Sequence, residues 1–217
     1  MARAARLPLA VALVTILAGC GGNEAAPTQT ERAASPPAAR PGSTGACPVT
    51  GKRIEIPPLD PTKTYTVTTR TNLGVFAFTL DVDDSPCTTA SFAALVRKKF
   101  FDGTRFHRIV PGFVIQGGDP TGTGSGGPGY TVVDTPPATA RYTKGVVAMA
   151  KTGADPAGTS GSQFFVVTAD DAGLPPEYAL LGKVTRGLAV VERIGKLGDA
   201  NEHPTRRVVI ASMTVSP

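Results

Sequence analysis

Tryptophan is absent from the 217-residue sequence, and only two histidines and three cysteines are present. The chain also lacks the Gly-Lys-Ser/Thr end of a phosphate-binding loop, the Gly-x-Ser-x-Gly turn of α/β-hydrolases and the Cys-x-x-Cys pair of zinc sites. With so few potential ligands, we expect no bound metal. A serine hydrolase is disfavoured too, because it would have to use His107 or His203.

A hydrophobic run long enough to cross a membrane is missing near the N-terminus. Residues 7–17 form an apolar run of 11 residues, whereas a spanning helix needs about 20. The run follows Arg3 and Arg6 and leads to Leu-Ala-Gly-Cys ending at Cys20, which resembles the bacterial lipobox. The resemblance implies a signal peptide over residues 1–19 and lipidation of Cys20. The protein would then be anchored in the lipid bilayer, on the extracytoplasmic face of the cell membrane.

Charge of one sign is not concentrated anywhere in the chain. The formal charge is +5, and removal of the signal peptide with its two arginines leaves +3. Nucleic-acid binding would need a broad basic stripe, so no nucleic-acid partner is expected. The 25 glycines and 20 prolines favour a β-rich fold with many turns, or a disordered segment. Residues 20–61 are rich in Ala, Pro, Gly, Ser and Thr and are predicted to form a flexible linker.

Two cysteines remain after lipidation of the first, and they are Cys47 and Cys87. Outside the cytoplasm such a pair is expected to form a disulfide. The bridge would clip the end of the linker to the folded domain. Two free buried thiols are the alternative, which mass spectrometry without reduction distinguishes.

Residues 62–217 form the predicted folded domain. Alternating apolar residues on both sides of Asn72-Leu73-Gly74 predict a hairpin. Ser85 and Pro86 suit the start of a helix that ends at the basic residues 97–99, and a second helix is predicted at residues 188–194. Further strands are predicted at residues 104–110, 113–116, 130–133, 146–150, 163–168, 178–184 and 208–215. This pattern favours a mainly β fold, a closed eight-stranded antiparallel β-barrel capped by two α-helices.

A glycine-rich stretch, residues 122–127, formally matches Gly-x-Gly-x-x-Gly. A dinucleotide site needs a helix directly after the glycines, but Pro128, Gly129 and a strand-like run follow here. We therefore exclude nucleotide binding and interpret the stretch as a backbone excursion along the rim of a site. His107 is interpreted as a structural histidine, because strand alternation points it away from the face that carries Arg108.

Two sequence blocks carry the most information. Residues 106–120 read Phe-His-Arg-Ile-Val-Pro-Gly-Phe-Val-Ile-Gln-Gly-Gly-Asp-Pro, and residues 161–165 read Gly-Ser-Gln-Phe-Phe. In order and spacing they resemble the cyclophilins, a family of peptidyl-prolyl cis/trans isomerases, over about residues 65–215. The resemblance implies a cyclophilin-like barrel and an enzyme that accelerates rotation of X-Pro peptide bonds without a cofactor.

The resemblance also implies a role for particular residues. Its catalytic positions fall on Arg108, Phe113 and Gln116. Its substrate-binding positions fall on Val114, Ala150, Lys151, Gln163, Phe165, Leu174 and Tyr178. The implied partners are proline-containing peptides and unfolded secreted proteins, and a monomer is expected. Periodicity alone does not separate Arg108 from Arg105.

Four positions depart from the family pattern. Val114 stands where many members have Met, Lys151 replaces an Asn beside the substrate path, and Tyr178 stands where eukaryotic members often have His. Gly173 stands where some members have Trp, so cyclosporin-type inhibitors are expected to bind weakly. The departures at Val114, Lys151 and Gly173 leave a second hypothesis open, a catalytically weak cyclophilin scaffold that acts as a proline-peptide binding module.

Overall fold

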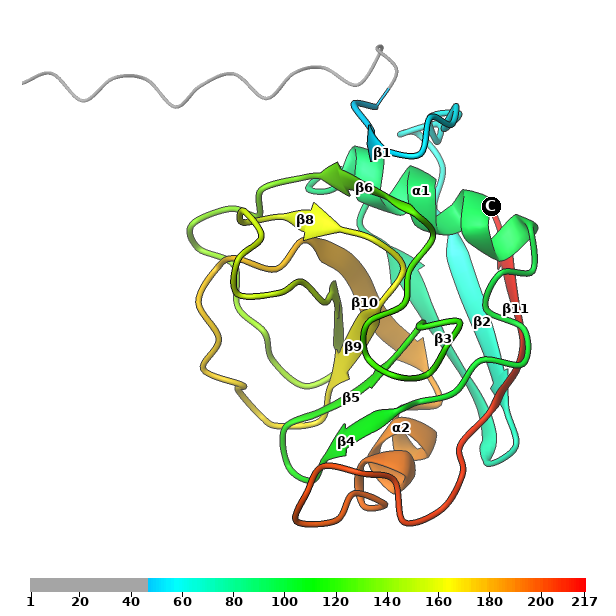
Figure 1. The fold of residues 1–217 in the computed structure, drawn as a ribbon, viewed down its shortest axis with the longest axis vertical. Coiled ribbons are helices and arrows are strands. Elements are labelled where there is room, and N and C mark those ends of the chain that lie inside the picture. Colours follow the sequence, from blue (N-terminus) through cyan, green and yellow to red (C-terminus); the bar gives the residue numbers. More distant parts are fainter. Residues whose placement is uncertain (1–46) are drawn as a thin grey trace, which may run out of the picture. The chain divides into compact units, whose positions relative to one another are not determined.

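Residues 47–217 are described by the computed structural model, and most of their strands belong to one eight-stranded antiparallel sheet (Figure 1). Across the sheet the strands are β11 (Ile210–Ser216), β2 (Thr66–Thr71), β3 (Gly74–Leu80), β10 (Leu180–Arg186), β7 (Val146–Met149), β9 (Phe164–Val167), β5 (Val114–Gly117) and β4 (Arg108–Val110). β2 and β3 form the predicted hairpin. The predicted signal peptide, Cys20 and the first part of the predicted linker lie outside the described residues.

The sheet is an open half-barrel, so the prediction of a closed barrel is wrong. Its edge strands, β4 and β11, form no ladder with each other. The predicted strand at residues 104–110 is regular only over Arg108–Val110. Before it, Arg105 forms isolated bridges to both Asp119 and Val209. Hydrogen bonds between the two edges are therefore local, and the ladder stops short of closure.

A second, small sheet accounts for the predicted strand at residues 130–133. This strand, β6 (Tyr130–Val133), pairs with β1 (Thr50–Gly51) on one side and β8 (Thr159–Ser160) on the other. The sequence placed it in the barrel, but its partners are two very short strands that alternation does not reveal. The small sheet lies beside the mouth of the half-barrel (Figure 1).

Two helices cover opposite ends of the half-barrel (Figure 1). α1 (Pro86–Arg97) packs against β11, β6 and β10, and α2 (Leu188–Gly195) packs against β3, β4 and β5. Gly187 precedes α2 with φ of 77°, and a Cβ atom there would lie 2.4 Å from the carbonyl oxygen of Val75. Only glycine fits both the backbone angle and the close approach.

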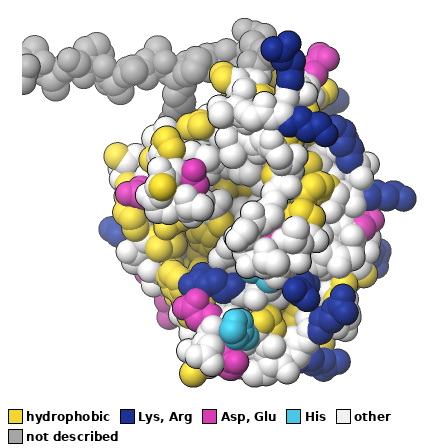
Figure 2. Space-filling model, in the orientation of Figure 1, with side chains coloured by type: hydrophobic (Ala, Val, Ile, Leu, Met, Phe, Trp, Pro, Cys, Tyr) yellow, Lys and Arg dark blue, Asp and Glu magenta, His cyan; other side chains and the backbone are white. Residues whose placement is uncertain are grey.

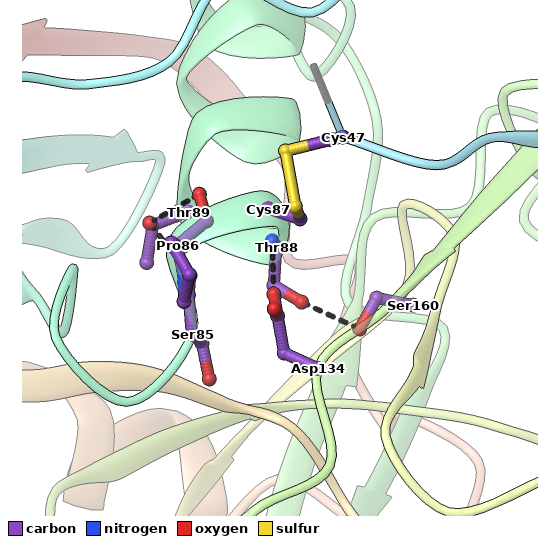
Figure 3. The surroundings of a disulfide bond; sticks show 8 residues. All are labelled: Cys47, Ser85, Pro86, Cys87, Thr88, Thr89, Asp134 and Ser160. Carbon is purple, nitrogen blue, oxygen red and sulfur yellow. Dashed lines mark hydrogen bonds between the residues drawn. A yellow bond between two sulfur atoms is a disulfide. The ribbon is translucent and has the colours of Figure 1, made fainter. Parts of the chain in front are cut away.

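α1 begins at Pro86 with Ser85 as its N-cap residue, as the sequence predicted, but the capping hydrogen bond comes from another side chain. Ser85 precedes the helix, but its side chain makes no cap hydrogen bond. Instead the carboxylate of Asp134 accepts the backbone N–H of Thr88 (Figure 3). A negative charge at this end also complements the helix dipole. A residue 46 positions away thus satisfies one of the free amides of the first turn.

Residues 47–61 lie against the domain, which corrects the predicted linker end at residue 61. Ile56 and Leu59 are buried in the main core, at 3% and 7% exposure. A disulfide joins Cys47 to Cys87 in the first turn of α1, with 5.4 Å between their Cα atoms (Figure 3). We call residues 47–61 the N-terminal arm. Within the described part of the chain, no helix is both long and apolar enough to cross a membrane.

Candidate active site

Three neighbouring strands, β5, β7 and β9, bury apolar side chains on both faces of the sheet. Successive side chains of a strand point to opposite faces, so alternate residues enter different clusters. Ile115, Val147 and Val166 belong to the main core, which also contains Phe76, Phe78, Phe106 and Phe164. Val114, Ala148 and Phe165 belong to a second cluster on the other face. These strands therefore present a second apolar surface, on the face of the sheet that lies away from the main core.

Six side chains of the second cluster form what we call the apolar cup. They are Phe113, Val114, Ala150, Phe165, Leu174 and Tyr178. Val114 and Phe165 form its buried floor, at 2% and 5% exposure, and the other four are partly exposed. The space-filling view shows apolar side chains gathered in a hollow on this face, with charged side chains along its lower edge (Figure 2).

One wall of the cup is fixed by Tyr142, a residue that no sequence motif selected. The hydroxyl of Tyr142 donates to the carbonyl oxygen of Tyr178 at 2.6 Å and accepts from its backbone N–H at 3.0 Å. The Tyr178 ring meets the Phe165 ring edge to face, with centroids 5.5 Å apart. Burial raises the pKa of Tyr142 to about 12, so the hydroxyl keeps its proton and both bonds at neutral pH.

A row of polar side chains borders the cup. Arg108 on β4 lies opposite Gln116 on β5, which in turn lies opposite Phe165 on β9. The guanidinium Nη1 of Arg108 donates to Gln116 Oε1 at 3.2 Å, and Gln116 Nε2 donates to Gln163 Oε1 at 3.1 Å. The sheet register thus places a fixed cation beside the apolar floor.

The glycine-rich loop is folded around a buried carboxylate. Asp119 is fully buried, and it accepts hydrogen bonds from Thr121 and from the backbone N–H groups of Gly124 and Gly126. Burial alone would raise the pKa of Asp119, but these bonds outweigh it and hold the pKa well below its ordinary value. A Cβ atom on Gly126 would overlap the Asp119 carboxylate. The loop leads to β6 and not to a helix, which agrees with the exclusion of a dinucleotide site.

The loop and the polar row form one hydrogen-bonded chain. Gln163 Nε2 donates to the carbonyl oxygens of Gly124 and Gly126, at 2.9 and 3.0 Å. A cavity of about 620 Å³ lies at this junction, and Gln116 and Gln163 line it together with Ala150, Lys151 and the loop. Thr50 and Gly51 of the N-terminal arm form part of its wall. The arm therefore reaches the site, which the sequence did not predict.

Lys151 is a buried cation within the site. Its side chain is 3% exposed, and its ammonium group lies 3.1 Å from Glu177 Oε2. It also donates to the carbonyl oxygen of Asp155 and lies 5.6 Å from the centre of the Tyr178 ring. With its charge paired, Lys151 holds the 151–155 loop and the Tyr178 wall together.

His107 takes no part in this network. Both of its ring nitrogens are buried without a hydrogen-bond partner among residues 47–217. Burial lowers its pKa, so the ring is neutral at neutral pH. No serine contacts either nitrogen in that part of the chain, and the hydrolase alternative has no support.

All ten residues that the resemblance assigned are brought together. They are joined through the apolar cup, the polar row and the cavity wall. Three further residues support the site and were missed: Tyr142, Glu177 and Glu202, whose carboxylate accepts a hydrogen bond from Arg108 Nε. Each is far in sequence from the side chain that it contacts, and no spacing rule connects them.

The fold and the site define a β-protein that can hold a small apolar ring beside a fixed cationic donor. The family model of cyclophilin type peptidyl-prolyl cis-trans isomerases matches residues 65–215. Peptidyl-prolyl cis-trans isomerase A of Mycobacterium tuberculosis is 38% identical over 175 residues, covering 72% of this chain and 94% of that protein. A peptidyl-prolyl cis-trans isomerase of Helicobacter pylori is also 38% identical, covering 66% of this chain and 94% of its own.

Solved structures agree with this match. A cyclophilin type peptidyl-prolyl cis-trans isomerase of Cryptosporidium parvum superposes with a TM-score of 0.64 at 30% identity, covering 71% of this chain and 99% of its own. The same protein in the presence of the dipeptide Ala-Pro gives a TM-score of 0.63. The chain belongs to the cyclophilin family and is a cyclophilin-type peptidyl-prolyl cis-trans isomerase.

Proposed function

We propose that the apolar cup binds the proline ring of an X-Pro segment and that Arg108 is the catalytic residue of the isomerase. The observation that carries the proposal is the juxtaposition of the two. In the sheet register Gln116 lies between Arg108 and Phe165 of the buried floor, and it accepts a hydrogen bond from the Arg108 guanidinium. The cup can hold the ring by burial of its apolar surface.

Isomerisation of an X-Pro bond needs little more than a cup for the proline ring and a hydrogen-bond donor beside it. A barrier of about 18–20 kcal/mol opposes rotation, because resonance gives the peptide C–N bond partial double-bond character. No bond is made or broken, so neither a nucleophile nor a cofactor is required. In the twisted state the nitrogen lone pair is localised, and a charged N–H group of Arg108 can donate to it. A donor that bonds the twisted amide better than either planar isomer lowers the barrier.

The remaining assigned residues hold the substrate and the donor. Gln116 orients the guanidinium, and Gln163 and Ala150 contact the peptide backbone beside the cavity. Lys151 and Tyr178 form one wall of the site. The departure at Lys151 changes this wall, because its amine is occupied by Glu177 and the neighbouring backbone.

The protein acts outside the cytoplasm, as a lipoprotein anchored through Cys20, and assists the folding of secreted or cell-envelope proteins. The N-terminal sequence supports this location, since a charged start, a short apolar run and a lipobox-like tetrapeptide occur in order. The Cys47–Cys87 bridge suits an oxidising compartment.

One observation favours the binding-module alternative. Gly173 is exposed, and a Cβ atom there would meet nothing within 4 Å. Beside Leu174 the cup therefore lacks the wall that a Trp supplies in some family members. A shallower cup would hold the proline ring less firmly in place beside Arg108, which would lower turnover more than it lowers capture of the peptide, and it would weaken the binding of cyclosporin-type inhibitors.

Kinetics of Arg108 variants test the proposal. Arg108→Ala is expected to lose at least tenfold in kcat/KM on a short X-Pro peptide, since a charged hydrogen bond contributes roughly 1.5–3 kcal/mol. Arg108→Lys is the matched control, because it keeps the charge and loses the two fixed N–H contacts; we expect an intermediate loss. Wild-type turnover in Arg108→Ala would rule out this mechanism. A wild-type protein that binds the peptide without accelerating it would favour the binding module.

A further inference from the structure

The geometry around Arg108 points to Glu202 as a positioning residue for catalysis: we propose that its carboxylate fixes the plane of the Arg108 guanidinium. The inference rests on the proposed role of Arg108. Glu202 lies 94 residues from Arg108 in sequence, in the loop between α2 and β11, and neither signature block contains it.

The backbone of Glu202 is held in an unfavourable conformation. Its φ is 65°, and Lys99 is the other residue besides glycine with a positive φ among residues 47–217. Side chains other than those of Gly, Asn and Asp rarely adopt this region. Strain of this kind persists only where the surroundings impose it, and it is common at functional sites.

Hydrogen bonds on both sides of Glu202 impose that conformation. Its N–H donates to the carbonyl oxygen of Asp199 at 3.0 Å, and its own carbonyl oxygen accepts the N–H of Ile109 at 2.9 Å. The second bond fastens the loop to β4, next to Arg108. Asp199 Oδ1 also accepts the N–H of His203 at 2.8 Å. The loop is therefore a rigid support that brings one carboxylate to one arginine.

The contact between the Glu202 carboxylate and Arg108 is short, and it leaves one nitrogen of the guanidinium free to donate to a substrate. Glu202 Oε2 lies 2.6 Å from Arg108 Nε, and Gln116 Oε1 accepts from Nη1. Two acceptors on different nitrogens fix the planar group in both position and orientation. The N–H groups of Nη2 have no partner in the described part of the chain. They are the donors left for the substrate.

The charge state of Glu202 suits this role. The hydrogen bond from Arg108 lowers the pKa of Glu202 below its ordinary value, so the carboxylate is charged at neutral pH. The two side chains are 34% and 46% exposed. Exposed ion pairs contribute little to stability. The value of the pair therefore lies in orientation, and its loss should affect the twisted state more than substrate binding.

Glu202→Gly gives a sharp test, because glycine accepts the positive φ and removes only the side chain. In the full-length protein we expect an unchanged or higher Tm together with a three- to tenfold lower kcat on an X-Pro peptide and a KM within twofold of wild type. Glu202→Gln keeps an acceptor oxygen and is expected to recover part of the loss. Wild-type kcat in Glu202→Gly, or a loss carried by KM alone, would overturn the inference.

Lys99→Gly is the matched control. It relieves the other positive φ, in the loop after α1, and is expected to raise Tm while leaving kcat unchanged. The Nε–H resonance of Arg108 provides a readout without turnover. It should exchange slowly with solvent in the wild type and quickly in Glu202→Gly, even if the wild type proved inactive. Equal exchange in both proteins would overturn the inference and leave the proposed isomerase role intact.

Discussion

At the residue scale, the site depends on charged side chains that are fixed by hydrogen bonds, in two cases together with an ion pair, Arg108–Glu202 and Lys151–Glu177. Asp119 is the clearest case, because its carboxylate is fully buried and its partners are Thr121 and two backbone amides of the loop. Such bonds favour the ionised form. The loop that Gln163 contacts is thus organised by a single side chain.

The pH dependence of stability follows from Asp119. Because its folded-state pKa lies below the unfolded value, the ionised group stabilises the fold above the ordinary pKa of about 3.9, and this stabilisation is lost as the pH falls further. Asp119→Asn leaves at least one amide without an acceptor, and we expect a loss of about 2 kcal/mol at pH 7. Urea unfolding between pH 2 and 7 should show a flatter profile for Asp119→Asn. Parallel profiles would contradict this account.

Single residues also show how far sequence reasoning reaches. Arg108 and Arg105 were indistinguishable by alternation, and only the motif selected Arg108. The structure places Arg105 against the carbonyl oxygen of Gly122, away from the polar row. Glu202 could not be found, because a positive φ and a contact across 94 residues leave no local pattern.

At the scale of elements, two segments far from the signature blocks shape the site. The N-terminal arm forms part of the cavity wall through Thr50 and Gly51, which pair with β6. The segment around Tyr178 is pinned by the hydroxyl of Tyr142. Alternation predicted the long strands well. It missed β1 and β8, which have two residues each. The predicted closed barrel was also wrong, because isolated bridges take the place of a ladder between the two edges of the sheet.

The disulfide should stabilise the arm and the domain together. Cys47 and Cys87 are 40 residues apart, and closing such a loop contributes about 4 kcal/mol in the chain-entropy model. The double variant with serine at both positions is expected to unfold at a clearly lower urea concentration. The pairing itself is checked by mass spectrometry of the unreduced protein, where two free thiols would contradict it.

Tyr142→Phe tests the contribution of the Tyr178 wall of the cup to substrate binding without changing the floor of the cup. The variant leaves the backbone groups of Tyr178 without their partner, at a cost of about 1–2 kcal/mol. We expect KM for an X-Pro peptide to rise severalfold while kcat changes less, because the ring is held less firmly and Arg108 is untouched. A change confined to kcat in steady-state kinetics would show that this wall does not bind the substrate.

At the scale of the whole molecule, a cyclophilin domain is joined to a predicted membrane anchor. The domain is described from Cys47 onward, and the family match covers residues 65–215. The N-terminal sequence predicts where the domain works, and the site determines what it does there.

Removal of the predicted lipid anchor should change where the protein is found in the cell and leave its isomerase activity intact. Cys20→Ser removes the thiol that would be alkylated, so the protein is expected to move from the membrane fraction to the soluble fraction. Turnover per molecule on an X-Pro peptide should stay the same. Fractionation of cells with an antibody measures the first effect. A membrane-bound Cys20→Ser variant would contradict lipidation at this position.

The central claim is that this site accelerates rotation of X-Pro bonds. The most direct measurement is NMR exchange spectroscopy of an Ala-Pro peptide, with a catalytic amount of the protein, because it observes both isomers without a coupled reaction. Uncatalysed exchange takes tens to hundreds of seconds. The account predicts exchange within the time of the experiment for the wild type and a return towards the uncatalysed rate for Arg108→Ala. Uncatalysed exchange in the presence of folded, peptide-binding wild-type protein would contradict it.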